Sequence, residues 1–427
     1  MPQDVLKRYN DFLVSLADDL DIPPSTYLRI VQSYNAVGEW LNSGEYEGSF
    51  DGVSVYPQGS AALGTLTKPF KRLKKKGYDI DLVCELSIPK SNTTPDKIKR
   101  AVGERLKDNK VYNRMLDEEG KRCWTLEYSE DEAGNEFHLD VLPSVRESAE
   151  RIELLSKHTD HMGLIDTSIA ITNKNTDGTY KWDTSNPLGY CKWFNNINNN
   201  MLQAISANAR QKLYENNKTL FASVEEVPNQ LIRTPLQRAI QIMKRHRDIR
   251  FSGHDFEDYK PISIIITTLA ARLYGNEADV FSALKNIIEK LHLYSSLMEG
   301  KSPFTEEPLI ERGSDGKWKI VNPVNKRENF ADKWDEDNGA RARAFFEWVA
   351  WLYTDLIQVT QNKDLDTILE SVKGRFNVKP GNTESPISMP NVIPARKKPY
   401  VEIENPSKPW CNTITPCVIK PKNISKK

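Results

Sequence analysis

The chain has 427 residues, room for two or three domains, and its 28% charged and 38% hydrophobic residues are typical of a globular protein. The net charge is zero, which argues against a uniformly basic nucleic-acid-binding protein. No apolar run is long enough to cross a bilayer, the N-terminus lacks the apolar core of a signal peptide, and the five cysteines form no CxxC pair. We therefore expect a cytoplasmic protein that neither spans a membrane nor holds structural zinc.

Residues 1–50 predict two helices. The second follows Pro23-Pro24, a pair that suits a helix start, and carries an apolar stripe at helical spacing: Tyr27, Ile30, Val31, Tyr34, Val37, Trp40 and Leu41. The pattern then changes to short strands. Val53–Tyr56 reads as one strand, and Tyr78–Leu86 as another, because its apolar residues alternate with Asp79, Asp81 and Glu85. Cys123–Ser129 and Glu136–Leu142 are expected to pair as a hairpin.

The second half of the chain is predicted to be helical. The stretch from Lys157 to Asn186 shows no clear period, so we expect a long polar connection there, suited to binding or lid loops. Helices are expected at Pro187–Leu202, from an N-cap at Thr234 to about Arg247, after Pro261, and at Asp279–Met298, Ala340–Val359 and Asp364–Val372. The last 55 residues hold nine prolines, and eleven Lys and Arg against three Glu, which predicts a basic tail without long helices.

Three aspartates are the strongest chemical feature of the sequence. Asp79 and Asp81 share one face of a strand, with alpha carbons roughly 6.5–7 Å apart. Carboxylates this close repel one another, and divalent ions relieve the repulsion. Asp140, in the otherwise apolar strand FHLDVLP, is the natural third ligand because a buried aspartate needs a partner. A single DxD pair is most often a solvated strand edge, so the prediction depends on all three together.

A Gly-Ser turn precedes the aspartates. Gly59 lets the backbone approach a phosphate closely, and Ser60 adds a hydroxyl donor. Phosphates supply the remaining oxygen ligands that Mg²⁺ prefers. A lone Gly-Ser is usually only a turn. A strand, this turn, a DxD strand and a hairpin strand with a third Asp, in that order, indicate instead a hydroxyl that attacks an α-phosphate and releases pyrophosphate.

These motifs carry a resemblance. PQGSAALGT, YDIDLV and HLDVLP resemble the DNA polymerase β-like nucleotidyltransferase superfamily, and within it the bacterial CD-NTases, the cGAS/DncV-like nucleotidyltransferases of CBASS antiphage systems. Further similar segments bring the resemblance to roughly Leu6–Val372. It implies an α+β, two-lobed fold: spine helices in residues 1–50, a mixed sheet lobe with the catalytic acids in 51–185, a helical lobe in 186–375, and a basic, Pro-rich tail in 376–427.

The resemblance also implies roles for single residues. Asp79, Asp81 and Asp140 match the acids that hold two Mg²⁺ or Mn²⁺ ions, and Gln58, Gly59 and Ser60 match the triphosphate-binding turn. Lys244 and Ser263 match positions that reach the triphosphate from the helical lobe. From the residues alone, Lys244 could equally be a solvated flank beside an apolar stripe, and Ser263 could simply cap a helix.

The implied activity is the condensation of nucleoside triphosphates, ATP and/or GTP, into a cyclic di- or trinucleotide that activates an effector protein in antiphage defence, with accessory CBASS proteins as possible partners. Alternatives are nucleotide transfer to an RNA end or a protein hydroxyl, and a non-catalytic nucleotide or nucleic-acid sensor. Lys68–Lys76 holds six basic residues in nine. This run is either a solvated loop or a contact for triphosphates or an activating polyanion, and we expect no requirement for nucleic acid.

Overall fold

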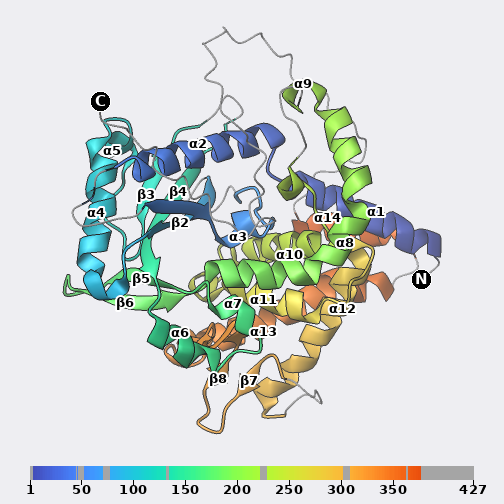
Figure 1. Cartoon of the computed structure of the whole chain (residues 1–427). Coiled ribbons are helices and arrows are strands. Elements are labelled where there is room, and N and C mark those ends of the chain that lie inside the picture. The colour runs from blue at the N-terminus through green and yellow to red at the C-terminus, as the bar shows by residue number, and fades with distance from the viewer. Residues whose placement is uncertain are drawn as a thin grey trace.

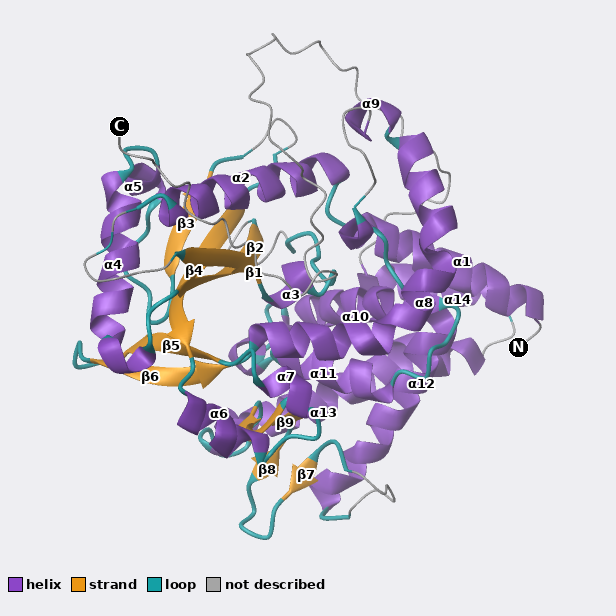
Figure 2. Ribbon diagram, viewed as in Figure 1, coloured by secondary structure: helices purple, strands orange, loops and turns teal. Residues whose placement is uncertain are grey.

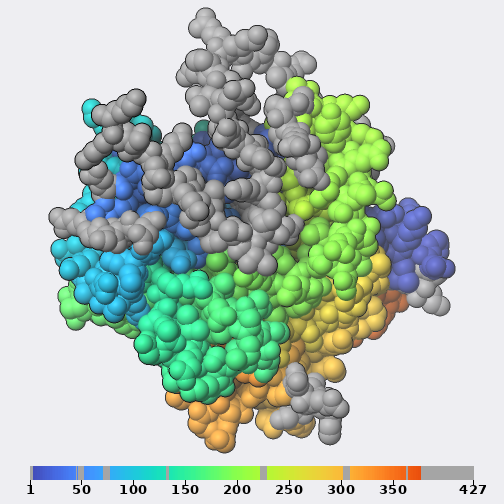
Figure 3. All heavy atoms as spheres, in the orientation of Figure 1, coloured from blue at the N-terminus to red at the C-terminus, as the bar shows by residue number. Residues whose placement is uncertain are grey.

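The computed structural model describes residues 3–44, 46, 52–70, 77–130, 134–221, 228–301, 308–361 and 364–376. A sheet forms one side of the molecule and a group of helices the other, as Figure 1 and Figure 2 show. In the space-filling view, residues coloured light blue to blue-green cover the sheet side, and the helical side carries light green, yellow and orange residues together with the dark blue N-terminal ones (Figure 3). We call the two parts the sheet lobe and the helical lobe.

The sheet lobe contains a mixed sheet of six strands. The strands are β1 (Val53–Pro57), β2 (Tyr78–Leu86), β3 (Trp124–Tyr128), β4 (Phe137–Arg146), β5 (Ile169–Lys174) and β6 (Tyr180–Ser185). Strands β2 and β4 run parallel, and every other pairing in this sheet is antiparallel. The hairpin of β3 and β4 confirms the sequence-based prediction.

One face of the sheet builds the core of this lobe. The inward residues of β2, such as Ile80 and Leu82, pack with Ile98 and Val102 of α4 (Pro95–Asp108) and with Ile30 of α2 (Pro24–Asn42). The opposite face of β2 presents Asp79 and Asp81, because side chains alternate along a strand. The short helices of this lobe are α3 (Gly59–Ala62), α5 (Tyr112–Met115), α6 (Ala149–Ser156) and α7 (Met162–Ile165).

The helical lobe has a separate hydrophobic core. Its helices are α8 (Pro187–Asn216), α9 (Lys218–Phe221), α10 (Pro235–Phe251), α11 (Ser263–Leu273), α12 (Val280–Leu293), α13 (Ala340–Leu352), continued by a π-helical turn (Tyr353–Ile357), and α14 (Leu365–Phe376). Helix α10 runs through the centre of this core and begins as predicted, with Thr234 and Gln237 forming a capping box. Two small hairpins, β7–β8 (Glu311–Arg312, Trp318–Lys319) and β9–β10 (Val321–Asn322, Asn325–Asn329), lie between α12 and α13.

The two N-terminal helices divide between the two cores. Helix α1 (Gln3–Leu20) packs on the helical lobe through Tyr9 and Leu13, whereas α2 packs on the sheet. The first 42 residues therefore connect the helical lobe with the sheet lobe. The domain limits expected from the sequence stay a prediction.

The prediction of a long polar connection from Lys157 to Asn186 is wrong. This stretch contains α7 and the strand pair β5–β6, which extends the sheet beyond β4. Strand β6 has the sequence YKWDTS, and its side chains are half-buried or exposed, so it lacks the apolar alternation that marks a half-buried strand. Among the described residues, no helix is long and apolar enough to cross a membrane.

Candidate active site

Strands β2 and β4 bring the three predicted carboxylates together. The parallel register places Asp81 directly beside Asp140, and Asp79 beside His138. One carboxylate oxygen from each of Asp79, Asp81 and Asp140 lies within 4.8 Å of the others. Asp79 is exposed, and the other two are half-buried. The cluster therefore opens to solvent at one end and rests on the sheet at the other.

The Gly-Ser turn lies directly against this cluster. Gly59 adopts a φ of +59°, and a Cβ at this position would lie 2.5 Å from Asp81 Oδ2, so only glycine fits without displacing the carboxylate. The amide of Gln58 donates to the carbonyl of Asp81 over 2.8 Å. Ser60, half-buried, follows in the first turn of α3. The predicted phosphate turn and the predicted acids thus form one continuous surface.

This donor set fits a hard divalent cation. Three carboxylates that converge from adjacent strands provide oxygen ligands, the type that Mg²⁺ and Mn²⁺ prefer, and their mutual repulsion favours a cation between them. The adjacent turn leaves room for phosphate oxygens, since Gly59 carries no side chain and is exposed. Cysteine and histidine ligands are absent from this cluster, so its chemistry differs from that of a structural zinc site.

Lys244 reaches the same region from helix α10, but it is buried. Its side chain donates to the carbonyl (3.2 Å) and the hydroxyl (3.1 Å) of Thr65, six residues after Gly59. Burial lowers the pKa of Lys244 to about 7, with a further decrease from Arg247, while Asp248 and Asp81 act in the opposite direction. The alternative of a solvated flank is therefore excluded, because only 5% of Lys244 is exposed.

Helix α10 holds the segment after the Gly-Ser turn through a row of side chains. Besides Lys244, Gln237 donates to the carbonyl of Leu63 (2.9 Å), and Gln241 to that of Leu66 (2.8 Å). Arg245 donates to the carbonyl of Lys68 over 2.5 Å. The spacing of these donors follows one side of the helix, so α10 fixes residues 63–68 relative to the helical lobe. Gln241 also donates to Asp21 at the end of α1.

Ser263 stands at the start of α11, exposed, and its hydroxyl accepts a hydrogen bond from Arg247 Nη1 (3.0 Å). The N-cap position is Ile262, and Ser263 makes no capping hydrogen bond among the described contacts of α11. Arg247 also binds Asp248 Oδ1 through Nε (2.9 Å) and Nη2 (2.7 Å). Arg247 therefore links Ser263 to the helix that carries Lys244.

Several residues of this region were not predicted from the sequence. Thr65 contacts Lys244, and Arg247 contacts Ser263. Thr125 on β3 contacts Asp140. The Thr125 contact follows from strand register, which a hairpin prediction could have supplied, whereas the other two depend on packing between lobes. Most of the basic run, residues 71–76, and the tail after residue 376 lie outside the described residues.

A sheet with convergent acids on parallel β2 and β4, a Gly-Ser turn beside them and a helical lobe facing both form the arrangement expected of a polymerase β-like nucleotidyltransferase. Comparisons with known proteins agree. Residues 53–143 match the family described as Cyclic GMP-AMP synthase DncV-like, nucleotidyltransferase domain. A c-di-GMP synthase from Roseivirga ehrenbergii is 29% identical over 374 residues, covering 87% of this chain and 85% of the relative.

A second relative is the cyclic dinucleotide synthase CdnG of Bradyrhizobium diazoefficiens, 25% identical over 332 residues, which are 76% of this chain and 70% of CdnG. The structure of CdnG in complex with GTP aligns with 87% of this chain and 99% of its own, at a TM-score of 0.58 and 19% identity, which supports the shared fold. The chain therefore carries a DncV-like nucleotidyltransferase domain and is similar to CD-NTases over most of its length.

Proposed function

We propose that this nucleotidyltransferase condenses nucleoside triphosphates, ATP and/or GTP, into a cyclic dinucleotide or trinucleotide with release of pyrophosphate. The observation that carries the proposal is the contact between two elements: the Gly-Ser turn lies against the carboxylate cluster, so a triphosphate bound on the turn would lie beside Asp81. The names of the two curated relatives, both cyclic dinucleotide synthases, support the same reaction.

Each residue then has a defined task. Gly59 and Ser60 bind the triphosphate through their backbone amides and the Ser60 hydroxyl, donors suited to an anion. Gln58 contributes through its side chain, because its own amide donates to Asp81. Lys244 sets the position of this turn through Thr65, and its amine is near enough to Asp81 to be affected by that charge. Ser263 is exposed at the start of α11, where it reaches toward the triphosphate from the helical lobe.

Asp79, Asp81 and Asp140 are proposed to hold two divalent ions, with Mg²⁺ or Mn²⁺ as the candidates. Bound ions supply Lewis-acid stabilisation of the attacking ribose oxygen and of the leaving pyrophosphate. The carboxylates orient the reacting groups in line, because they are fixed to a rigid pair of parallel strands. A final condensation closes the ring: a hydroxyl of the last ribose attacks the α-phosphate at the triphosphate end of the linear intermediate and releases pyrophosphate.

The proposal extends to the pathway. The product would activate an effector protein in CBASS antiphage defence, in the cytoplasm, with accessory CBASS proteins as further partners and without a requirement for nucleic acid. A helical-lobe boundary near residue 186 and a separate tail after residue 375 are part of the same proposal.

The test is product formation. The protein is incubated with α-labelled ATP and GTP, with Mg²⁺ or Mn²⁺, and the reaction is treated with phosphatase and separated by chromatography. A phosphatase-resistant product made with pyrophosphate release supports the proposal. Extended RNA or labelled protein would indicate the alternative transfer reactions, and triphosphate binding without pyrophosphate release would indicate a sensor.

A further inference from the structure

Thr125 makes a direct contact with Asp140. Its hydroxyl donates to Asp140 Oδ1 over 2.6 Å, a short hydrogen bond of the kind formed with a charged acceptor. The contact follows from register, since Thr125 lies directly opposite Asp140 in the antiparallel β3–β4 pair. Opposite residues on one face are near enough for their side chains to meet. Thr125 therefore engages one oxygen of a carboxylate that belongs to the cluster.

The side chain of Thr125 is restricted to this direction. A β-branched residue has few side-chain rotamers in a strand, so its hydroxyl stays aimed at Asp140. Its neighbours Trp124 and Leu126 point to the other face, into the core of the sheet lobe. The amide of Asp117 donates to the carbonyl of Thr125 over 2.9 Å, which secures the backbone on the outer edge of β3.

The start of β3 is held from the opposite side of the sheet. Lys99 of α4 is fully buried, and its Nζ donates to the carbonyls of Gly120 (3.0 Å) and Cys123 (2.9 Å), just before β3. Trp124 Nε1 donates back to the carbonyl of Lys99 over 2.9 Å. The buried amine of Lys99 thus fixes the turn before Thr125, from the face of the sheet opposite to Asp140.

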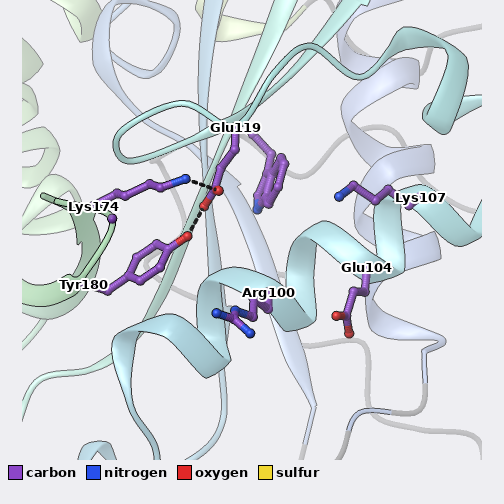
Figure 4. Close-up of a pocket in the computed structure, with 8 residues that line it drawn as sticks. Arg100, Glu104, Lys107, Glu119, Lys174 and Tyr180 are labelled. Atoms are coloured by element: carbon purple, nitrogen blue, oxygen red, sulfur yellow. Dashed lines mark hydrogen bonds and ion pairs between the residues drawn. The ribbon is translucent and has the colours of Figure 1, made fainter. Parts of the chain in front are cut away.

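A hollow of about 380 Å³ lies on that side, between α4 and the β5–β6 hairpin. In Figure 4, Lys174 and Tyr180 point toward Glu119 from the hairpin, while Arg100 and Glu104 lie on the facing helix. The carboxylate of Glu119 accepts from Lys174 Nζ and from the Tyr180 hydroxyl, each over 2.6 Å. Residues 119–123 are therefore fastened both to α4 and to β5–β6.

We propose that Thr125 is a positioning residue, which holds Asp140 in the orientation that binds a divalent ion, and that the turn at residues 119–123 makes this orientation rigid. The proposal rests on the proposed function, because it assigns Asp140 to the metal-binding carboxylates. A hydroxyl that orients a ligand from outside the coordination sphere typically changes metal affinity or activity by about 10–100-fold. Thr125 itself touches neither ion nor substrate.

The test compares Thr125→Val, which keeps the shape and removes the donor, with Thr125→Ser, which keeps the donor. Thr172→Val is the matched control, since Thr172 is a buried threonine of β5 whose hydroxyl has no hydrogen-bond partner among the described residues. Mn²⁺ binding is measured by the electron paramagnetic resonance of free Mn²⁺, with a non-hydrolysable GTP analogue present. The rate of pyrophosphate release with GTP and Mg²⁺ is the second measurement.

We expect Thr125→Val to weaken Mn²⁺ binding about 10–100-fold, and Thr125→Ser and Thr172→Val to stay within about threefold of wild type. The proposal is overturned if Thr125→Val binds Mn²⁺ within threefold of wild type, or if Thr125→Ser is as weak as Thr125→Val. Should thermal melts show that Thr125→Val is unfolded, the same comparison between Thr125→Ala and Thr125→Ser decides.

The two proposals can fail separately. If wild type binds Mn²⁺ but releases no pyrophosphate, the proposed function is wrong, and the Mn²⁺ affinities still decide the role of Thr125. If wild type binds no Mn²⁺ even with the GTP analogue, the metal assignment and the role of Thr125 are both wrong.

Discussion

Two groups of acidic side chains in this molecule have opposite surroundings. In the sheet lobe, Asp79, Asp81 and Asp140 converge on one another from adjacent strands. In the helical lobe, Asp355 is buried in the π-helical turn and receives cationic and imidazole groups instead: Arg250 Nε (2.8 Å) and His246 Nε2 (3.0 Å) at Oδ2, and Arg375 Nε, 3.2 Å from Oδ1.

This difference in surroundings distinguishes an acid that stabilises the fold from acids that are suited to bind a metal ion. Burial alone would raise the pKa of Asp355, but hydrogen bonds from His246 and Arg250 hold that pKa below its usual range, so the charge is compensated within the protein. The contacts join α10, α14 and the turn after α13, which makes Asp355 a structural residue. The three carboxylates of the sheet lobe instead bring like charges together, and a divalent ion bound between them relieves the repulsion.

The largest effect should come from the carboxylate cluster of the sheet lobe. We expect Asp81→Asn to reduce product formation at least about 10,000-fold, equivalent to ~5 kcal/mol of transition-state stabilisation, because it removes a central ligand. The melting temperature should stay equal or rise, since a source of repulsion is lost. Chromatography of labelled products and a thermal melt measure the two effects. A variant that unfolds while wild type does not would place Asp81 with Asp355 as a structural acid.

For Asp355 in the helical lobe we expect the reverse: a loss of stability without a loss of specific activity. Asp355→Asn should lower the free energy of unfolding by about 1.5–3 kcal/mol, because it weakens the charge-assisted hydrogen bonds that the buried carboxylate accepts from His246 and Arg250. Urea unfolding followed by circular dichroism gives this value. The fraction of protein that remains folded should retain its specific activity. Unchanged stability would show that Asp355 is not a structural residue.

A smaller, pH-dependent effect is expected from Lys244. Its pKa is lowered to about 7 in the folded protein, so between that value and the ordinary lysine value the unfolded chain binds more protons. The contribution of Lys244 to stability therefore rises with pH from about 7 to about 10, by about 1–3 kcal/mol in total. Urea unfolding of wild type and Lys244→Met at pH 6.5 and pH 9.5 measures how much Lys244 contributes to the pH dependence of the free energy of unfolding. Equal pH dependence in the two proteins would contradict the buried, perturbed amine.

The smallest effect should come from an acid at the surface. Glu289 pairs with Lys285 one helical turn away on α12, over 2.7 Å, and the two side chains are 40% and 48% exposed. Glu289→Gln should change stability by less than about 0.5 kcal/mol and leave product formation unchanged. It serves as the control for both carboxylate-to-amide changes above, and a large effect on either measurement would show that loss of negative charge alone explains them.

The parts of the site that depend on local sequence pattern could be predicted, and those that depend on packing between distant segments could not. Alternation along β2 placed Asp79 and Asp81 on one face, and the hairpin prediction brought Asp140 into the same sheet, because both depend on local pattern. Strand β6 was missed because its residues are polar at the sheet edge. The burial of Lys244 against Thr65 could not be read from the sequence, since it depends on how α10 packs on residues 63–68 of the other lobe.

The most direct test of the account is the location of bound metal. Crystals grown with Mn²⁺ and a non-hydrolysable GTP analogue are measured for anomalous scattering. We predict two manganese peaks in contact with the carboxylates of Asp79, Asp81 and Asp140, with the triphosphate on the turn at Gly59 and Ser60. A bound analogue with no manganese between these three side chains would contradict the account.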